Sequence, residues 1–281
     1  MLTQELTVIK ANGDRVIFSM DKLRESMRRS GADKLIIEQV ITEITPKLYE
    51  GITTKTIYQL AFSLLKKRSK TAAARYKLKK ALMEIGPSGF PFERFVAELF
   101  RKKGYKTQTS IIVQGFCISH EVGVIASTET EQFMIECKYH SLAGKLTDVK
   151  VPLYIHSRFR DVLVTWNGND KLKSKEISGW IVTNTRFSDD ALQYGNCAGL
   201  KLLAWDYPMG NGIKDIIDEH KVYPITCLTG ITKIEKEKIL SKEIVFCDAL
   251  LKNKQLLFSI GLSEKRINGL FDEIENLVAC H

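Results

Sequence analysis

The first third of the chain passes from short strand-like patterns of apolar residues to longer helix-like ones. Two alternating runs flank Asn12-Gly13-Asp14, and an Asn-Gly step accepts the positive φ of a tight turn, so the pattern predicts a β-hairpin. Apolar residues then recur at helical spacing, and Asp21 and Gly31 predict the two ends of the first helix. Further helical patterns, the second capped by Thr53 or Thr54, follow at residues 33–51, 53–69 and 70–86.

The middle of the chain combines an amphipathic helix with runs of strand periodicity. Two glycines and two prolines within residues 86–91 predict a linker. Residues 92–105 then carry one apolar stripe, formed by Phe92, Phe95, Val96 and Leu99. Strand patterns follow near residues 110–114, 118–126 and 132–138, before helices and strands alternate over residues 151–205. This order predicts a mixed sheet flanked by helices.

From Thr226 onward the pattern is helical, and Ser263 predicts the start of the last helix after a tight turn at residues 260–263. We therefore predict an α/β chain of the multidomain α+β kind. Its three domains would be a helical bundle capped by a β-hairpin at residues 1–86, a mixed-sheet domain at residues 87–222, and an all-α domain at residues 223–281.

Net charge adds a preference for acidic partners. The formal charge is +9, and residues 1–85 hold 17 Lys and Arg against 9 Asp and Glu, so +8 of the excess lies in the first predicted domain. A basic surface favours nucleic acid as a partner. The chain opens without an apolar leader, and no run approaches the ~20 apolar residues of a membrane span. This predicts a cytoplasmic protein with no membrane partner.

Cysteine and histidine form no recognisable metal-binding pattern. The histidines His120, His140 and His156 stand alone, which favours structural or surface roles. The absence of a CxxC pair favours reduced thiols over disulfides or a zinc site. The six cysteines are Cys117, Cys137, Cys197, Cys227, Cys247 and Cys280.

Strand periodicity gathers charged residues in the middle domain. On the strand at residues 118–126, Ser119, Glu121, Gly123 and Ile125 would share one face, with His120, Val122 and Val124 opposite. On the next strand Glu136 and Lys138 share a face. Carboxylates held beside a lysine suit metal-assisted hydrolysis of phosphodiesters, because Mg²⁺ binds carboxylate oxygens and a lysine can orient water. The plainer interpretation is a polar face of an edge strand.

The arrangement of helix, strand, "HEVGVIA", turn and "MIECKYH" resembles the PD-(D/E)xK nucleases, specifically the Mrr-like restriction endonucleases. The resemblance implies Mg²⁺- or Mn²⁺-dependent cleavage of DNA. It implies that Glu136 and the carbonyl of Cys137 hold the metal with help from Glu93, and that Lys138 positions the attacking water. It also places a metal-binding aspartate at position 123.

Gly123 departs from this pattern, because glycine offers no metal ligand. Glu121 shares the predicted face, but it lies one strand repeat away, ~6.6 Å along the strand. Three explanations stay open: an aspartate replaced deliberately to silence a toxic nuclease, a naturally decayed nuclease, or a rearranged and active site that uses Glu121.

The N-terminal domain resembles the ATP-cone, a regulatory nucleotide-binding domain, through "VIKANGDRVIFSMDKL", "EGITTKTIYQLAFSLL" and "AAARYKLKKAL". The resemblance implies ATP or dATP binding with contacts from Val8, Lys10, Lys22 and Thr54. Ala11-Asn12 departs from the family pattern, and a solvated lysine face or a DNA-binding surface is the alternative. The C-terminal "IGLS" turn resembles a helix-hairpin-helix module, which holds DNA phosphate through backbone N–H groups.

Together these patterns predict a Mg²⁺-dependent restriction-type DNA endonuclease regulated by ATP or dATP. Cleavage of both strands needs two active sites, so we expect a homo-oligomer, a dimer or larger. The alternative is a non-catalytic, nucleotide-responsive DNA-binding regulator that keeps the nuclease fold as a binding platform.

Overall fold

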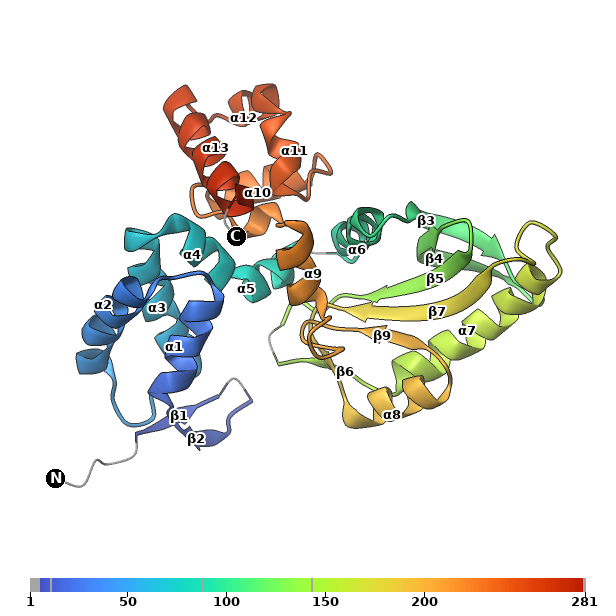
Figure 1. The fold of residues 1–281 in the computed structure, drawn as a ribbon, viewed down its shortest axis with the longest axis horizontal. Helices are drawn as coiled ribbons and strands as arrows, with labels where there is room; N and C mark the ends of the chain where they lie inside the picture. The colour runs from blue at the N-terminus through green and yellow to red at the C-terminus, as the bar shows by residue number, and fades with distance from the viewer. Residues whose placement is uncertain (1–5, 11, 87, 143, 280–281) are drawn as a thin grey trace. The chain divides into compact units, whose positions relative to one another are not determined.

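The computed structural model describes residues 6–10, 12–86, 88–142 and 144–279. The chain folds into two compact units, coloured along the sequence in Figure 1. The first unit comprises residues 1–80, 227–235 and 253–281, and the second comprises residues 81–226 and 236–252. Ala11 and Cys280 lie outside the described residues, so nothing further follows for either.

The first unit contains the predicted β-hairpin and a set of helices. Strand β1 (Thr7–Ile9) pairs antiparallel with β2 (Arg15–Ile17). Gly13 in the connecting turn has a φ of 90°, which confirms the Asn-Gly prediction. The helical elements of this unit are α1 (Met20–Arg29), α2 (Lys34–Ile44), η1 (Thr45–Lys47), α3 (Thr54–Arg68), α4 (Lys70–Tyr76), α12 (Lys254–Ser259) and α13 (Glu264–Ala279), with α5 (Leu78–Met83) spanning its boundary.

Side-chain caps determine where these helices begin. The hydroxyl of Ser19 accepts a hydrogen bond from the N–H of Lys22 at 3.2 Å, so Ser19 is the N-cap of α1 and the prediction of Asp21 is wrong. The hydroxyl of Thr53 accepts from the N–H of Thr56 at 3.0 Å, which decides between the two predicted caps of α3. Short polar side chains thus fix helix starts that apolar periodicity alone leaves uncertain.

Two predicted helices end earlier than expected. The helical pattern at residues 33–51 stops at Ile44 and continues only as the 3-10 turn η1. Pro46 accounts for this end, because proline has no N–H to continue the helix and its ring clashes with the preceding turn. The pattern at residues 70–86 is divided between α4 and α5, with Lys77 between them.

The second unit contains the predicted mixed sheet. Its strands are β3 (Lys106–Gln114), β4 (Ser119–Ser127), β5 (Glu131–Lys138), β7 (Glu176–Thr183) and β9 (Lys201–Leu203), in the spatial order β3-β4-β5-β7-β9. The pairs β3–β4 and β4–β5 are antiparallel, whereas β5–β7 and β7–β9 are parallel. The remaining elements are α6 (Phe90–Lys102), β6 (Leu146–Thr147), α7 (Lys150–Asn167), β8 (Arg186–Phe187), α8 (Asp189–Cys197), α9 (Ile213–His220), η2 (Ile225–Cys227), α11 (Cys247–Leu251) and most of α10 (Lys233–Leu240).

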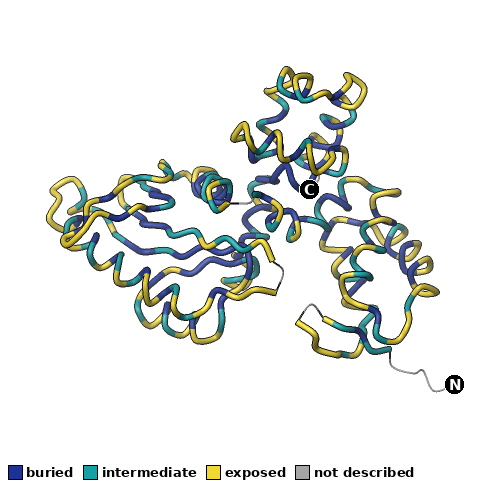
Figure 2. Tube along the Cα trace, turned by 180° about the vertical axis from the view of Figure 1, so that it is seen from behind, coloured by how far each residue is buried: buried dark blue, intermediate teal, exposed yellow. Residues whose placement is uncertain are grey.

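Helices α6 and α7 cover opposite faces of this sheet (Figure 1). The predicted apolar stripe of α6 is buried, and the ring of Phe100 lies 5.3 Å from that of Trp180 and 6.1 Å from that of Phe133. On the other face, Ile155 and Phe159 of α7 pack in one cluster with sheet residues. The strands β4, β5 and β7 are therefore largely buried, as the dark segments in Figure 2 show, whereas the edge strand β3 is mostly exposed.

The structure also bears on the cysteines and on the predicted absence of a membrane span. The cysteines within residues 6–279 that the structure describes, Cys117, Cys137, Cys197, Cys227 and Cys247, form no disulfide with one another. Among the described helices, none is both long enough and apolar enough to cross a membrane.

A methyl group at position 179 tests the packing of α7 on the sheet. A Cβ added at Gly179 would lie 2.8 Å from Cγ of Phe159 and 3.0 Å from Cδ2 of Leu200. We expect Gly179→Ala to lower the free energy of unfolding by ~1–3 kcal/mol, because a packed core accepts extra volume only with strain. Gly168→Ala at the end of α7, where the nearest atom would lie at 3.5 Å, should stay within ~0.5 kcal/mol. Urea unfolding followed by tryptophan fluorescence measures both, and an unchanged Gly179→Ala would contradict this packing.

Candidate active site

The carboxylate of Glu93 lies directly over Gly123. Glu93 is in the first turn of α6, and Gly123 is in the middle of β4. A Cβ at position 123 would lie 3.2 Å from Cδ and 3.4 Å from Oε1 of Glu93. The hydroxyl of Ser110 on β3 donates a hydrogen bond to Oε2 of Glu93 at 3.0 Å. The structure therefore brings together two of the predicted site positions and adds Ser110, which the sequence did not single out.

The regular alternation of side chains is interrupted at this point. Val122 and Ile125, predicted on opposite faces of β4, both pack in the cluster that contains α7. The break lies opposite Ser110 of β3, which has a φ of 51° and sits between the pairs Thr109–Val124 and Ile111–Val122. Such a left-handed residue is unusual in a strand, and strict alternation is the wrong rule at this position. Ser110 and Gly123 are consequently both turned toward Glu93.

Glu136 lies where β4 and β5 stop pairing. The last pair of this ladder is Val124 with Ile135, so Glu136 is the next residue of β5 and Gly123 is the adjacent residue of β4. Burial raises the pKa of the Glu136 carboxyl, the guanidinium of Arg158 lowers it, and the charge of Glu93 raises it. Burial likewise raises the pKa of Glu93, with a smaller contribution from the charge of Glu121. The carboxylates of Glu93, Glu121 and Glu136 thus share one electrostatic neighbourhood.

The other predicted members of the site lie around these carboxylates. Lys138 and Glu121 are exposed, and the positive charge of Lys138 acts to lower the pKa of Glu136. Burial raises the pKa of the Cys137 thiol well above its usual value, so the thiol is neutral and only the peptide carbonyl is a candidate ligand. Glu93 therefore links the predicted positions: it lies against Gly123 and interacts through its charge with Glu121 and Glu136, while Lys138 interacts with Glu136.

The site offers a hard divalent cation two carboxylates and a peptide carbonyl as donor groups. Within the described residues, no three His, Cys, Asp or Glu side chains lie close enough together to hold a metal ion. The negative charge of Glu93 nevertheless raises the pKa of Glu136. A cation between the two carboxylates would relieve this repulsion. Mg²⁺ is usually held by one or two carboxylates with waters and phosphate oxygens. Glu93, Glu136 and the Cys137 carbonyl can supply such a set.

Arg158 is a site residue that the sequence did not identify. Its Nη1 lies 3.1 Å from Oε2 of Glu136. The partner of Asp161 is His120, with Nε2 2.8 Å from Oδ2. This agrees with a structural role for His120. Only the fold could reveal the contact between Arg158 and Glu136, because no motif or sequence spacing connects a residue of α7 with one of β5.

The predicted nucleotide residues lie in the first unit. Lys10, Lys22 and Thr54 are exposed, whereas Val8 is buried in the core with 2% of its surface accessible. An isolated parallel bridge joins Ile9 to Thr53. Lys10 and Thr54 each follow one of these bridged residues, so the end of β1 and the start of α3 lie side by side.

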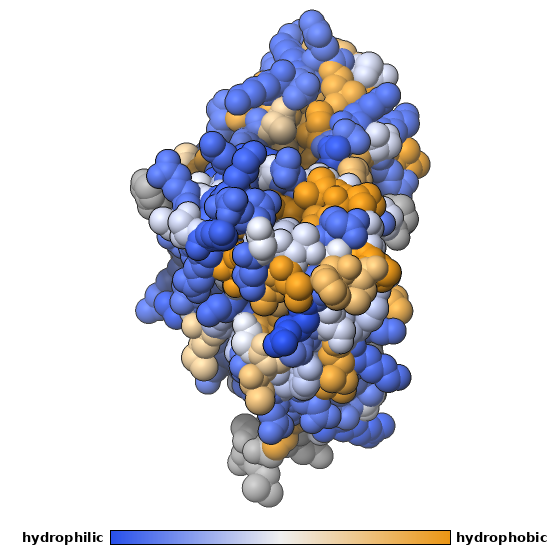
Figure 3. All heavy atoms as spheres, turned by 90° about the vertical axis from the view of Figure 1, so that its right-hand side faces the viewer, coloured by the Kyte–Doolittle hydropathy of each residue, from blue (hydrophilic) through white to orange (hydrophobic). Residues whose placement is uncertain are grey.

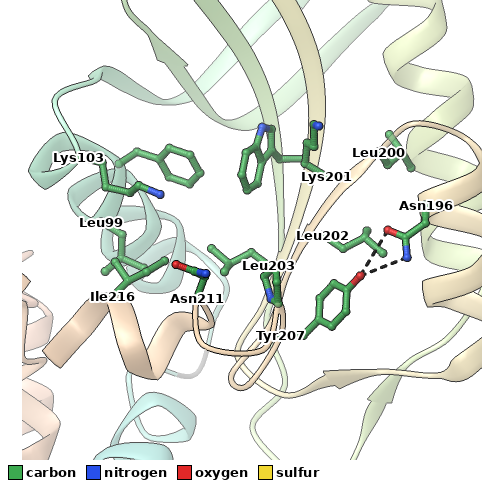
Figure 4. Close-up of a pocket in the computed structure, with 13 residues that line it drawn as sticks. Leu99, Lys103, Asn196, Leu200, Lys201, Leu202, Leu203, Tyr207, Asn211 and Ile216 are labelled. Carbon is green, nitrogen blue, oxygen red and sulfur yellow. Dashed lines mark hydrogen bonds between the residues drawn. The ribbon is translucent and has the colours of Figure 1, made fainter. Parts of the chain in front are cut away.

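A cavity of about 290 Å³ lies elsewhere in the second unit. Figure 4 shows its lining, which includes Lys103 just after α6, Trp180 of β7 and Lys201 of β9, with the side chain of Asn196 hydrogen-bonded to that of Tyr207. Glu93, Glu121 and Glu136 are not among the lining residues. The carboxylate site is therefore separate from this cavity.

The fold and the carboxylate site define a restriction-endonuclease-like domain. The family model for Mrr-type restriction endonucleases matches residues 87–207, which confirms the resemblance for the middle of the chain. A second model, described as the C-terminal domain of AF1548-like proteins, matches residues 223–278. Both matches begin after residue 86, so neither bears on the ATP-cone resemblance.

The chain belongs to the AF1548-like family. An uncharacterised protein of Archaeoglobus fulgidus is 35% identical over 184 residues, which is 65% of this chain and 99% of that protein. The crystal structure of AF1548, a protein of unknown function, is 33% identical, has a TM-score of 0.54, and covers 68% of this chain and 98% of its own. Can2 from Sulfobacillus thermosulfidooxidans, solved in complex with cyclic tetra-adenylate, is 12% identical with a TM-score of 0.33 over 72% of this chain and 53% of its own, a likeness too low to carry an argument.

The pH dependence of stability tests the hydrogen bonds of Asp161. The N–H of Cys117 and then the ring of His120 lower the pKa of this carboxyl to about 2. Because the folded pKa is lowered, Asp161 stabilises the fold above pH ~4, and the contribution is lost as the pH falls from ~4 toward 2. The difference in urea midpoint between the parent and Asp161→Asn should therefore shrink below pH ~4. Asp170→Asn, at a side chain 88% exposed, is the control, and a constant difference for Asp161→Asn would contradict the assignment.

Proposed function

We propose that this chain is a divalent-cation-dependent DNA endonuclease of the restriction type. The observation that carries the proposal is the position of the Glu93 carboxylate over Gly123, beside Glu136 at the end of the β4–β5 ladder, in a domain matched to restriction endonucleases. Cleavage of a phosphodiester needs a nucleophile and positive charge near the phosphate oxygens. In this proposal the carboxylates bind the cation that supplies the positive charge, and the lysine beside them orients the nucleophilic water.

The residues have separate roles in this proposal. Glu136, the Cys137 carbonyl and Glu93 bind Mg²⁺ or Mn²⁺. The bound ion supplies a Lewis acid and an activated water. Lys138 is exposed beside Glu136, where its ammonium group can orient the attacking water and face the phosphate. Glu121 lies at the edge of the site and acts through its charge on Glu93.

The basic first unit supports a regulatory role for ATP or dATP. Lys10 and Thr54 are exposed and lie side by side, and Lys22 is in the first turn of α1, where the helix dipole also favours an anion. Val8 is in the core, so we assign the ligand contacts to Lys10, Lys22 and Thr54. Nucleotide binding there would control access to the nuclease site or its assembly.

Assembly follows from the chemistry of double-strand cleavage. One site of this kind cuts one strand at a time, so we propose a homo-oligomer, at least a dimer, on DNA. The helical C-terminal segment supports a DNA contact in one respect: Gly261, in the tight turn before α13, has a φ of 96°. Backbone N–H groups at such a turn can hold a phosphate, as in a helix-hairpin-helix module.

The second candidate is a non-catalytic, nucleotide-responsive DNA-binding regulator. Gly123 favours it, because the family pattern has a carboxylate there. The two candidates differ in what a restored aspartate would do.

Restoring the carboxylate at position 123 tests catalysis. We expect Gly123→Asp to raise Mg²⁺-dependent nicking of supercoiled plasmid by ~10²-fold, the scale of one electrostatic group in an active site. A Cβ at position 123 already lies 3.2 Å from the Glu93 carboxyl group, so the Glu93 side chain must move aside to admit the aspartate carboxylate. Gly123→Asn, equal in size and uncharged, should not raise nicking, and adding Glu136→Ala should abolish the gain. If Gly123→Asp cleaves neither single- nor double-stranded DNA, the endonuclease proposal fails and the non-catalytic regulator is the supported candidate.

Nucleotide binding is tested by thermal shift. At ~100 times the Kd, ATP or dATP would stabilise the parent by ~2.7 kcal/mol through binding the folded state. Lys10→Ala and Lys22→Ala should lose most of the shift because each removes a cation for the phosphates. Lys34→Ala removes an exposed lysine of the same unit outside the proposed site and should keep the shift. A full shift in both Lys10→Ala and Lys22→Ala would remove the proposed nucleotide site.

A further inference from the structure

Arg158 is held at the carboxylate site by several groups at once. Nη1 lies 3.1 Å from Oε2 of Glu136, and Nη2 donates to the peptide oxygen of Glu121. The guanidinium also lies over the ring of Tyr154, 5.4 Å from its centroid. Only 12% of the Arg158 side chain is exposed. A side chain with this many contacts has lost its rotamer freedom, so it presents one fixed donor to Glu136.

His120 and Asp161 form a second set of contacts with Arg158. Nε of Arg158 lies 3.5 Å from Nδ1 of His120, and Nε2 of His120 lies 2.8 Å from Oδ2 of Asp161. An arginine only donates, so Nδ1 of His120 is the acceptor and Nε2 carries the proton given to Asp161. Such a chain fixes the tautomer and orientation of the imidazole.

Asp161 is itself anchored to the turn between β3 and β4. Its Oδ1 accepts from the N–H of Cys117 at 2.8 Å, and its Oδ2 from the N–H of Ile118 at 3.3 Å. A Cβ at Gly115 would collide with Oδ2, so glycine is required for this approach. The turn exposes 73% of Phe116 and 61% of Ile118. Figure 3 shows one face of the molecule, on which apolar patches lie among hydrophilic residues. The chain of contacts thus runs from an exposed turn to Glu136.

Arg158 approaches Glu136 from the side of α7, whereas Glu93 belongs to α6 on the opposite face of the sheet. The bond from Arg158 uses Oε2 and leaves Oε1 of Glu136 for another partner. A cation bound through Oε1 would not occupy the place of the guanidinium.

We propose that Arg158 is a positioning residue that orients the carboxylate of Glu136 for a divalent cation, and that His120 and Asp161 hold Arg158 in place. The proposal rests on the proposed function, because it concerns the same metal site. Residues that orient a metal ligand are worth ~10–100-fold in metal affinity. Replacement of Arg158 should lower the affinity for the divalent cation by a similar factor without unfolding the chain.

The test is Mn²⁺ binding to the full chain, measured by calorimetry with and without Gly123→Asp. We expect Arg158→Gln to weaken Mn²⁺ binding by ~10–100-fold. Arg158→Lys should recover only part of this, since an ammonium group cannot contact both Glu136 and the Glu121 carbonyl in the fork geometry of a guanidinium. Arg160→Gln removes an exposed arginine of the same helix and should bind Mn²⁺ as the parent does. His120→Gln should weaken binding less than Arg158→Gln.

The outcomes separate the role of Arg158 from the function itself. Loss of Mn²⁺ binding in Glu136→Gln, with unchanged or tighter binding in Arg158→Gln, would overturn the role of Arg158 and leave the metal site standing. Tighter binding would identify the guanidinium as a competitor of the cation. No Mn²⁺ binding by either the parent or Gly123→Asp would overturn both proposals. Thermal unfolding of each variant checks that a loss of binding is not a loss of fold.

Discussion

The packing of α6 on the sheet is the interaction on which the candidate site depends. Phe92, Phe95 and Leu99 are almost fully buried, and burial of such side chains contributes ~1.5–3 kcal/mol each. This stripe leaves Glu93, one residue after Phe92, at the border of the helix contact, where its carboxylate meets the backbone of β4. The apolar contact thus places a charged group that would otherwise stay in water. Glycine at position 123 gives that group the space it occupies.

Electrostatic balance is the second constraint on the site. Burial raises the pKa values of Glu93 and Glu136, and their negative charges repel each other. Arg158 offsets part of this cost at Glu136. An additional carboxylate at position 123 would increase the repulsion in the absence of a cation. Glycine at position 123 adds no charge to this repulsion.

The comparison with relatives separates the chain into a shared part and a remainder. The match to the Archaeoglobus fulgidus protein covers nearly all of that protein and 65% of this chain. The matches to the two family models lie within residues 87–278. The basic segment before them holds most of the excess positive charge. Any response to nucleotide would be an addition to the shared nuclease-like part, carried by a unit with its own core around Met27, Ile44 and Leu65.

The sequence by itself determined the order and type of most elements, because periodicity of apolar residues reports which face of each element is buried. It predicted the hairpin at Gly13, the stripe of α6 and the mixed sheet, and its family resemblance named Glu93, Glu136 and Lys138. It missed helix ends set by Ser19 and Pro46, where a single local group outweighs the periodic pattern. Only the tertiary structure decided the break in alternation opposite Ser110, the approach of Glu93 to Gly123 and the pairing of Arg158 with Glu136. Those contacts join residues far apart in the chain, and no local pattern of polarity specifies which distant side chains meet.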